Sequence, residues 1–433
     1  MADMAWGLLS PGQMRSTRRA RTLGVGAAVR AFNDLAVPGL GGVWFGKQLV
    51  LATLGVMLAQ DKPGKRISNI AMANAVEALA CCMTLNHRAN TALLDGRLRG
   101  STKLRGKDDL RFSVVSRPGF YVTQPMRMAS VQILPALGFV DASATRFNAF
   151  EITPLGRELV EEAVGRQVLK ALVEWVAGSS NMDSATVRKA LSPLTDLPEP
   201  AQEISASALQ QGSPQEDVKH KDRRRAALAW VESLRLNKRL GASQIDWTTK
   251  PALIDEAHWI DLQAGALFQS TRDAAIAVLL CVEKLLNTGA RQLPLIHPLP
   301  AVAITAINIL RTKAQAFITF GHRQADAKAF CLECVDTDDI RVLSKLVVRD
   351  DRVLQLRQGA VVPGPAFEAA TNAPPTPEQS IDEASEATPD RHQIPWPDGM
   401  SRRLNNLFLL SADLHQDITQ WMNKLETVPG DDA

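Results

Sequence analysis

The sequence predicts a mainly α-helical protein of several domains, in which one small α/β unit is embedded. Alanine and leucine abound, aromatic residues make up only 5%, and the chain holds a single tyrosine. Such a composition favours helix over sheet. With 433 residues, 45% of them hydrophobic and 22% charged, the chain is long enough to bury a core in two or three domains.

Composition and patterning divide the chain into six segments. They are a basic helical region over 1–112, an α/β unit over 113–175, a Pro/Ser/Gln-rich peripheral segment over 176–222, a helical domain over 223–363, a disordered acidic Pro-rich linker over 364–399 and an amphipathic helix over 400–425. Residues 1–170 hold 22 Lys and Arg against 12 Asp and Glu, and the remainder holds 27 against 34. The basic part is therefore expected to bind an anionic partner or to dock on the acidic part of its own chain.

In the first segment, a glycine-containing loop precedes two helices. Residues 33–46 contain a proline and four glycines, which predicts a loop or a series of turns. Apolar runs over 47–60 and 69–85 predict helices. The second run is apolar on nearly every face except at Asn69, Asn74 and Glu77, so we expect it at the centre of the core.

We expect a cytoplasmic protein without a membrane-spanning segment. The best apolar run, residues 48–60, is shorter than the roughly 20 residues that a bilayer requires. Five cysteines in a chain of this length do not make a disulfide framework, and they indicate reduced thiols.

The stretch GGVWFGKQ, residues 41–48, places Gly41, Gly46 and Lys47 at the G-x-x-x-x-G-K spacing of a phosphate-binding loop. In such a loop the next residue is a Ser or Thr that holds magnesium, whereas this chain has Gln48. The two aromatic residues inside the stretch would also crowd a phosphate. We therefore favour a glycine loop that enters a helix at about Lys47, with the aromatic residues packed against it as a hydrophobic staple. A degenerate nucleotide-binding loop is the alternative.

Residues 96–111, GRLRGSTKLRGKDDLR, are basic and are expected to form an exposed loop. Lys and Arg side chains on such a loop neutralise phosphates without reading base sequence. The candidates for nucleic-acid contact in this loop are Arg97, Arg99, Lys103, Arg105 and Lys107.

The α/β unit reads FYVTQPMRMASVQILPALGFVDASATRFNAFEITPLGRELV over residues 120–160. A helix, an LGFVD turn and an alternating strand precede a second helix, for which Thr153 fits the N-cap and Pro154 the first helical position. This order resembles the second half of bacterial winged-helix domains, in which a recognition helix, a two-stranded wing and a T-P-x-G-R helix start follow one another. The resemblance covers about 50 residues of the 433.

The resemblance implies that the helix over 124–137 enters the major groove and that Arg146 and Asn148 lie on the wing near phosphates. The predicted helix departs from that pattern, because the face that would read bases carries Arg127 among apolar residues, whereas base edges require donors and acceptors. Pro135 also distorts its last turn. Three interpretations stay open: docking on protein, sequence-independent phosphate contact, and base-specific reading of DNA.

Helical patterns return in the second half of the chain. Helices are predicted over 221–236, 252–267 and 270–287, with Ser270 as the N-cap of the third, and residues 301–318 and 339–356 are helix or strand. The composition of the linker leaves little core to offset the entropy of ordering. The amphipathic helix that follows it must dock on its own chain or on a partner.

Catalytic and metal-binding signatures are weak. Cys331 and Cys334, with His322 nine residues before the first, make half of a possible zinc site, whereas a structural site needs four ligands. The sequence contains no G-x-S-x-G, no H-E-x-x-H and no dinucleotide fingerprint. We therefore expect no catalytic residues and no cofactor.

These observations favour a non-catalytic adaptor or accessory subunit of a bacterial multi-protein assembly. The α/β unit would dock on protein and contact nucleic acid independently of its sequence. The style of the chain is similar to accessory proteins of antiviral defence or mobile-element clusters. The alternatives are a DNA-binding transcriptional regulator and a degenerate nucleotide-binding protein.

Overall fold

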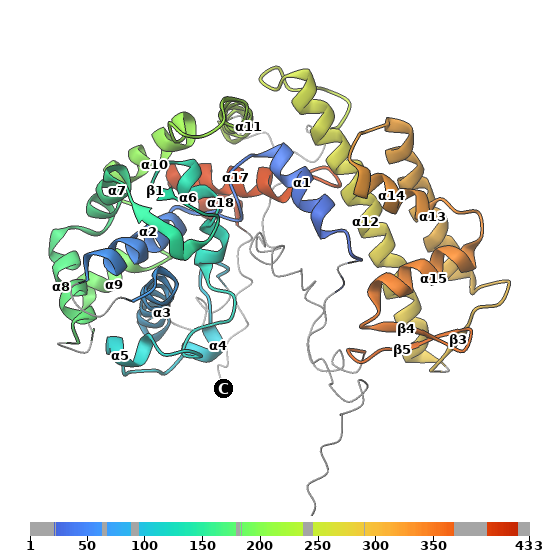
Figure 1. Cartoon of the computed structure of the whole chain (residues 1–433), viewed down its shortest axis with the longest axis horizontal. Helices are drawn as coiled ribbons and strands as arrows, with labels where there is room; N and C mark the ends of the chain where they lie inside the picture. The colour runs from blue at the N-terminus through green and yellow to red at the C-terminus, as the bar shows by residue number, and fades with distance from the viewer. Residues whose placement is uncertain are drawn as a thin grey trace, which may run out of the picture. The chain divides into compact units, whose positions relative to one another are not determined.

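The computed structural model describes residues 21, 23–62, 67–87, 95–178, 182, 184–236, 246–289, 291–367 and 396–422, and it is mostly helical, with only small sheets (Figure 1). The mainly helical fold is thus confirmed. The described chain divides into two compact units. The larger unit comprises residues 32–263 and 396–422, and the smaller unit comprises residues 21–31 and 264–367.

Two helices cross the division between the units, and the remaining elements belong to one unit each. The crossing helices are α1 (Gly26–Ala36) and α12 (Glu256–Thr288). The elements of the larger unit are α2 (Gly46–Asp61), α3 (Asn69–His87), α4 (Ser101–Leu104), α5 (Phe112–Val115), η3 (Met126–Ser130), α6 (Ile133–Ala136), β1 (Val140–Ala142), η4 (Phe147–Ala149), β2 (Phe150–Ile152), α7 (Pro154–Val164), α8 (Arg166–Val176), α9 (Ala185–Leu191), α10 (Glu199–Gln211), α11 (Val218–Leu236), α17 (Arg402–Leu414) and α18 (Ile418–Trp421). The elements of the smaller unit are β3 (Leu293–Pro294), α13 (Ala301–Phe320), α14 (Ala325–Cys334), α15 (Asp339–Asp350), β4 (Leu354–Arg357) and β5 (Ala360–Pro363).

The core of the larger unit is built on the pair α2 and α3, as the two apolar runs predict. Every residue of α2 from Gly46 to Ala59 is buried, and α3 is buried over most of its length. The two helices approach closely where Gly55 meets Ala73, because a Cβ on Gly55 would lie only 2.5 Å from the Ala73 Cα. A residue without a side chain is therefore required at the crossing of the two helices.

The C-terminal helix α17 completes this core. All residues from Arg403 to Leu414 are buried, and α17 packs against α11, α10 and α2. The Arg403 guanidinium pairs with the Asp34 carboxylate, and Arg235 of α11 pairs with Asp417 at 2.6 Å. The helix predicted over 400–425 thus docks on its own chain, but it is divided into α17 and α18, and residues 423–425 lie outside the described residues. The linker itself falls mainly on residues 368–395, which lie outside the described residues.

The segment over 176–222, which its composition predicts to be peripheral, contributes to the core instead. Its helices α9 and α10 bury Leu191, Ala201 and Leu209. Small alanine and serine side chains allow α10 to pack closely, and Ser205 is buried because its hydroxyl donates to the Ala201 carbonyl at 2.8 Å. Polar composition does not make a segment peripheral when its polar atoms are satisfied within the helix.

The α/β unit contains the predicted hairpin and the predicted helix start. Strands β1 and β2 pair antiparallel, with Val140 opposite Ile152. The Thr153 hydroxyl accepts from the Gly156 N–H at 3.0 Å, and Pro154 stands at the first position of α7. This N-cap prediction is confirmed, whereas the family resemblance as such stays a prediction.

The continuous helix expected over 124–137 is wrong. The segment forms the 3₁₀ helix η3 and the single turn α6 instead. Pro135 has no N–H to donate within a helix, and the carbonyl of Ala129 accepts from the Gly42 N–H of the preceding loop at 3.1 Å. The predicted strand over 146–153 likewise begins with η4, so only Phe150–Ile152 is extended.

The smaller unit packs α13, α14 and α15 beside the C-terminal part of α12. Phe268 of α12 lies 5.9 Å from Phe317 of α13 and 6.2 Å from Phe330 of α14, between ring centroids. A small antiparallel sheet has the order β3-β5-β4, in which β3 precedes α13 and β4 and β5 follow α15. Residues 339–356, which the sequence leaves as helix or strand, are therefore helix up to Asp350 and then strand.

The helices expected over 252–267 and 270–287 are one helix, α12. The predicted N-cap Ser270 lies inside it, since the helix continues through Gly265 and Ser270, and the Thr271 hydroxyl donates back to the Leu267 carbonyl at 2.8 Å. Among the described residues, α12 is also the one helix that is long and apolar enough to cross a membrane. Core helices pass the same test, and Phe268 and Leu279 of α12 are fully buried.

Candidate functional site

The glycine stretch 41–48 is a buried entry into α2. Gly41 has φ +61°, and a Cβ on it would lie 2.6 Å from the Ala129 carbonyl oxygen. Trp44 and Phe45 are buried, and their rings are in edge-to-face contact with each other. The Gly46 N–H donates to Asp413 Oδ2 at 2.7 Å, and the Trp44 N–H donates to the Gln48 side chain at 2.8 Å. Amide groups that a phosphate loop turns toward its ligand are here bonded to protein.

Lys47 is buried with its ammonium bonded inside the protein. Nζ donates to the Ala190 carbonyl at 2.6 Å, and only 2% of the residue is exposed. Burial lowers the pKa of Lys47 to about 8, against the opposing charges of Asp413 and Asp196. Burial also raises the pKa of Asp413 to about 6, while the Gly46 N–H and the Arg97 charge act against this rise. Lys47 is therefore part of a buried charge cluster that includes Asp413.

The eight residues proposed for nucleic-acid contact divide by exposure. Arg97 is buried and paired with Asp95 at 2.8 Å, which removes it from an exposed loop. Arg99, Lys107 and Arg127 are half-buried, and Lys103, Arg105, Arg146 and Asn148 are exposed.

Several of these side chains are already bonded to protein groups. Lys103 Nζ donates to the Tyr121 carbonyl at 2.8 Å, and Lys107 Nζ lies 4.6 Å from the centroid of the Phe120 ring. Arg127 Nε donates to the Asn74 side chain at 2.6 Å, and Asn148 accepts from the Ile70 N–H at 3.0 Å. Arg105 of the loop and Arg146 of the hairpin are the exposed arginines among the eight candidates.

A buried polar cluster on α3 was not predicted as a unit. Glu77 accepts from the Arg127 N–H at 2.5 Å, and burial raises its pKa to about 8. One turn later, the Cys81 thiol lies 3.6 Å from the Tyr121 hydroxyl, and burial raises its pKa to about 11. Because a thiol with a raised pKa stays protonated at neutral pH, it is a poor nucleophile. The sequence signal that could have indicated this cluster is the i, i+4 spacing of Glu77 and Cys81, which places both residues on one face of the helix.

The half zinc site is not completed. Cys331 and Cys334 are buried in α14, and burial raises the pKa of Cys331 to about 12. His322 Nδ1 accepts from the Gln324 N–H at 3.3 Å. Within the described part of the chain, no three His, Cys, Asp or Glu residues are grouped as metal ligands.

A groove of about 770 Å³ in the larger unit lies between the β1–β2 hairpin and the loop after α1. Its lining is Asp34, Pro38, Gly39, Val131, Gln132, Pro135, Ala142, Ser143, Ala144, Thr145, Phe150 and His220. Val131, Gln132 and Pro135 belong to the segment 124–137, which the winged-helix resemblance would place in the major groove, and here they line this groove. The Asp34 carboxylate at this groove is already paired with Arg403.

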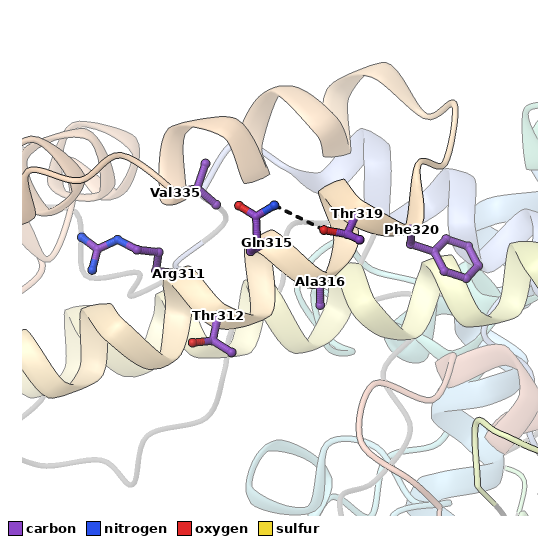
Figure 2. A pocket seen from close by; sticks show the side chains of 7 residues that line it. All are labelled: Arg311, Thr312, Gln315, Ala316, Thr319, Phe320 and Val335. Carbon is purple, nitrogen blue, oxygen red and sulfur yellow. Dashed lines mark hydrogen bonds between the residues drawn. The ribbon is translucent and has the colours of Figure 1, made fainter.

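A second groove, of about 730 Å³, follows the outer face of α13 in the smaller unit (Figure 2). It is lined by Arg311, Thr312, Gln315, Ala316, Thr319, Phe320 and Val335. Arg311 is held in place by hydrogen bonds to the Asp336 carbonyl at 2.9 Å and to the Asp339 carboxylate at 2.7 Å. The rest of the lining is uncharged.

The outer face of α13 is unusual for a solvated helix. Within α13, all of whose residues the structure describes, none of the exposed side chains is charged. The exposed residues are Ala301, Val302, Thr305, Asn308, Ile309, Thr312, Gln315, Ala316 and Thr319. Val302 is 55% exposed and Ile309 is 53% exposed. Exposed helix faces normally carry charged residues, so this face is a candidate interaction surface, which we call the α13 face.

Comparisons with family models, with curated proteins and with solved structures find no match to this chain. Function is therefore argued from the surfaces themselves.

Proposed function

We propose that the chain is a non-catalytic adaptor or accessory subunit that binds protein through the α13 face. The uncharged character of this face carries the proposal. Removing water from an uncharged stripe costs little free energy, and burying Val302 and Ile309 against a partner is favourable. The proposed setting is a cytoplasmic bacterial assembly of the defence or mobile-element kind.

The internal chemistry supports a structural protein. Lys47, Glu77 and Cys81 are buried, and each of them makes at least one polar contact with a neighbouring protein group. The two grooves combine apolar lining with charged groups that are already paired, Asp34 in one and Arg311 in the other. Catalytic sites, by contrast, gather titratable groups with matched pKa values around a cleft that substrate can enter.

A capture experiment with matched variants tests the proposal. The full chain serves as bait in an extract of its own cells, beside Ile309→Asp and Val348→Asp. Val348 is 64% exposed on α15, where the neighbouring exposed positions are Arg341 and Lys345, so it controls for the loss of any exposed apolar residue.

We expect defined proteins to be retained by the wild type and by Val348→Asp and to be lost with Ile309→Asp. Retention that is unchanged by Ile309→Asp would remove the α13 face from the proposal.

A further inference from the structure

The exposed side chains of α13 follow a heptad register. Val302, Ile309 and Ala316 are spaced by seven residues, and Thr305, Thr312 and Thr319 repeat the same spacing three residues later. Alternating steps of three and four place all six on one stripe, which is the a/d pattern of a helix that packs along another helix. The opposite stripe is buried in the smaller unit; it consists of Ala303, Ile307, Leu310, Ala314 and Phe317. The geometry of the free stripe therefore fits a second helix.

The two halves of the stripe differ in the size of the side chains that they expose. Its N-terminal half presents the large side chains Val302 and Ile309, each more than half exposed. Its C-terminal half presents Thr312, Ala316 and Thr319, which line the groove of about 730 Å³. Figure 2 shows the small side chains along this half of the helix, with Val335 across the groove from Gln315. One half of α13 thus supplies protruding side chains and the other half supplies space.

We propose that the occupant of the α13 face is a second copy of this chain, whose α13 packs antiparallel to the first. This proposal rests on the proposed function, since it names the partner of the same face. An antiparallel pair related by a two-fold axis between residues 310 and 311 sets Val302 beside Thr319 of the second copy, Thr305 beside Ala316, and Ile309 beside Thr312. Each layer joins an a position to a d position. Ile309 meets the smaller Thr312 and Thr305 meets the smaller Ala316, whereas Val302 and Thr319 are similar in size.

A parallel pair is disfavoured by the same side chains. It would set each residue beside its own counterpart, so that Ile309 meets Ile309 while Ala316 meets Ala316 and leaves a gap. Antiparallel packing also opposes the two helix dipoles. A two-fold interface requires a surface that is complementary to itself, and a helix with protruding residues at one end and space at the other meets that requirement.

Among the e and g positions of the stripe, Lys313 is the one charged residue, and Arg311, which lines the groove, is paired with Asp339. The e and g positions are Ala306, Lys313 and Phe320 on one side and Ala301, Asn308 and Gln315 on the other. In a symmetric pair the two copies of Lys313 lie on the same flank near the two-fold axis, with no opposing acid in the stripe. Like charges close to each other weaken association at low salt, so the interface should strengthen as the salt concentration rises.

Sedimentation equilibrium of the full-length protein tests the pairing. A helix of 20 residues is about 30 Å long, which places a helix pair at the small end of specific interfaces. The apparent mass should therefore rise with concentration from 47.1 kDa toward twice that value. Ile309→Glu should weaken the association at least tenfold, Lys313→Gln should strengthen it severalfold, and Val348→Glu should leave it unchanged.

Cysteine crosslinking tests the direction of the pair. Antiparallel packing predicts that an equal mixture of Thr305→Cys and Ala316→Cys proteins, each made in a Cys281→Ser background, forms a disulfide-linked dimer on mild oxidation. Each variant alone should stay monomeric on a non-reducing gel. Circular dichroism of each variant confirms that the exposed substitutions leave the fold intact.

The outcomes separate the two proposals. A chain that stays at the monomer mass at all concentrations, or a link formed by Thr305→Cys alone, overturns the antiparallel pair. If the chain is monomeric yet captures a different protein in an Ile309-dependent way, the proposed function stands and this inference fails. If Ile309→Glu leaves self-association unchanged and Ile309→Asp leaves capture unchanged, both fail.

Discussion

The side chain of Asp413 accepts a hydrogen bond from the backbone N–H of Gly46 at 2.7 Å, although 367 positions separate the two residues. Gly46 is the first residue of α2, so a residue of α17 satisfies one of the amide groups that the start of a helix leaves without a partner. A carboxylate at this end of a helix is also favoured by the helix dipole. The C-terminal helix is therefore bonded to the start of the central helix of the larger unit.

Removing the Asp413 carboxylate should destabilise the larger unit. Asp413→Ala leaves the Gly46 N–H buried without an acceptor, which costs about 1–3 kcal/mol, whereas Asp413→Asn keeps an acceptor and should cost less. Urea unfolding followed by tryptophan fluorescence measures both. Equal stability of the Ala variant and the wild type would show that the bond contributes nothing.

Glu77 should make stability depend on pH in an unusual direction. Burial raises its pKa from 4.5 to about 8 in the folded chain, so folding favours the protonated carboxyl. Its contribution is complete below the unfolded value and is lost as pH rises through 8. Asp413, raised to about 6, acts in the same direction over a lower range.

The test compares unfolding midpoints between pH 5 and pH 8. The midpoint of the wild type should fall as pH rises through this window, and Glu77→Gln, which keeps an acceptor for the Arg127 N–H, should show a smaller fall. Parallel profiles for the two proteins would contradict the assignment to Glu77.

Gly55→Ala should destabilise the chain, although alanine favours helix by about 1 kcal/mol over glycine. The added Cβ would lie 2.5 Å from the Ala73 Cα and 2.9 Å from its nitrogen, and overpacking of this kind costs about 1–3 kcal/mol. Ala73→Gly in the same chain should rescue only part of the loss, since two of the three nearest atoms are backbone. Thermal unfolding measures the wild type, the single variant and the double variant, and complete rescue would place the strain in the Ala73 side chain alone.

Any binding of nucleic acid should depend on the exposed cations and not on Arg97. Arg105→Gln and Arg146→Gln should each weaken retention of a DNA duplex and reduce its dependence on salt. Arg97→Gln should instead lower the free energy of unfolding, by about 2 kcal/mol or more, because it leaves the partly buried Asp95 unpaired. Fluorescence anisotropy at two salt concentrations, beside urea unfolding, separates these effects. Weaker DNA binding by a fully stable Arg97→Gln protein would contradict this division.

The sequence predicted correctly those elements that are determined by residues close to one another in the chain. Continuous apolar runs identified α2 and α3, and the Thr153–Pro154 pair marked the start of α7. A glycine-rich stretch with aromatic residues was correctly interpreted as the entry to a helix. In each case the residues that decide the structure lie within a few positions of one another.

The rest depends on partners that are distant in sequence. Arg403 is buried because Asp34, 369 positions away, pairs with it, and no pattern around Arg403 indicates this. The end of η3 depends on the Gly42 N–H that reaches the Ala129 carbonyl. The α13 face was hidden for a different reason: residues 301–318 show apolar residues on both sides, and only the structure separates the buried stripe from the exposed one.

The position of α17 in the chain has a consequence for how the larger unit matures on the ribosome. Its core lacks this helix until residue 414 has been made, and by then the whole smaller unit has already left the exit tunnel. The start of α2 and the apolar wall beneath α17 therefore stay uncovered for most of translation, and such surfaces attract chaperones and aggregation. A released chain truncated after residue 400, which lacks α17, should be protease-sensitive in the larger unit while the smaller unit is resistant.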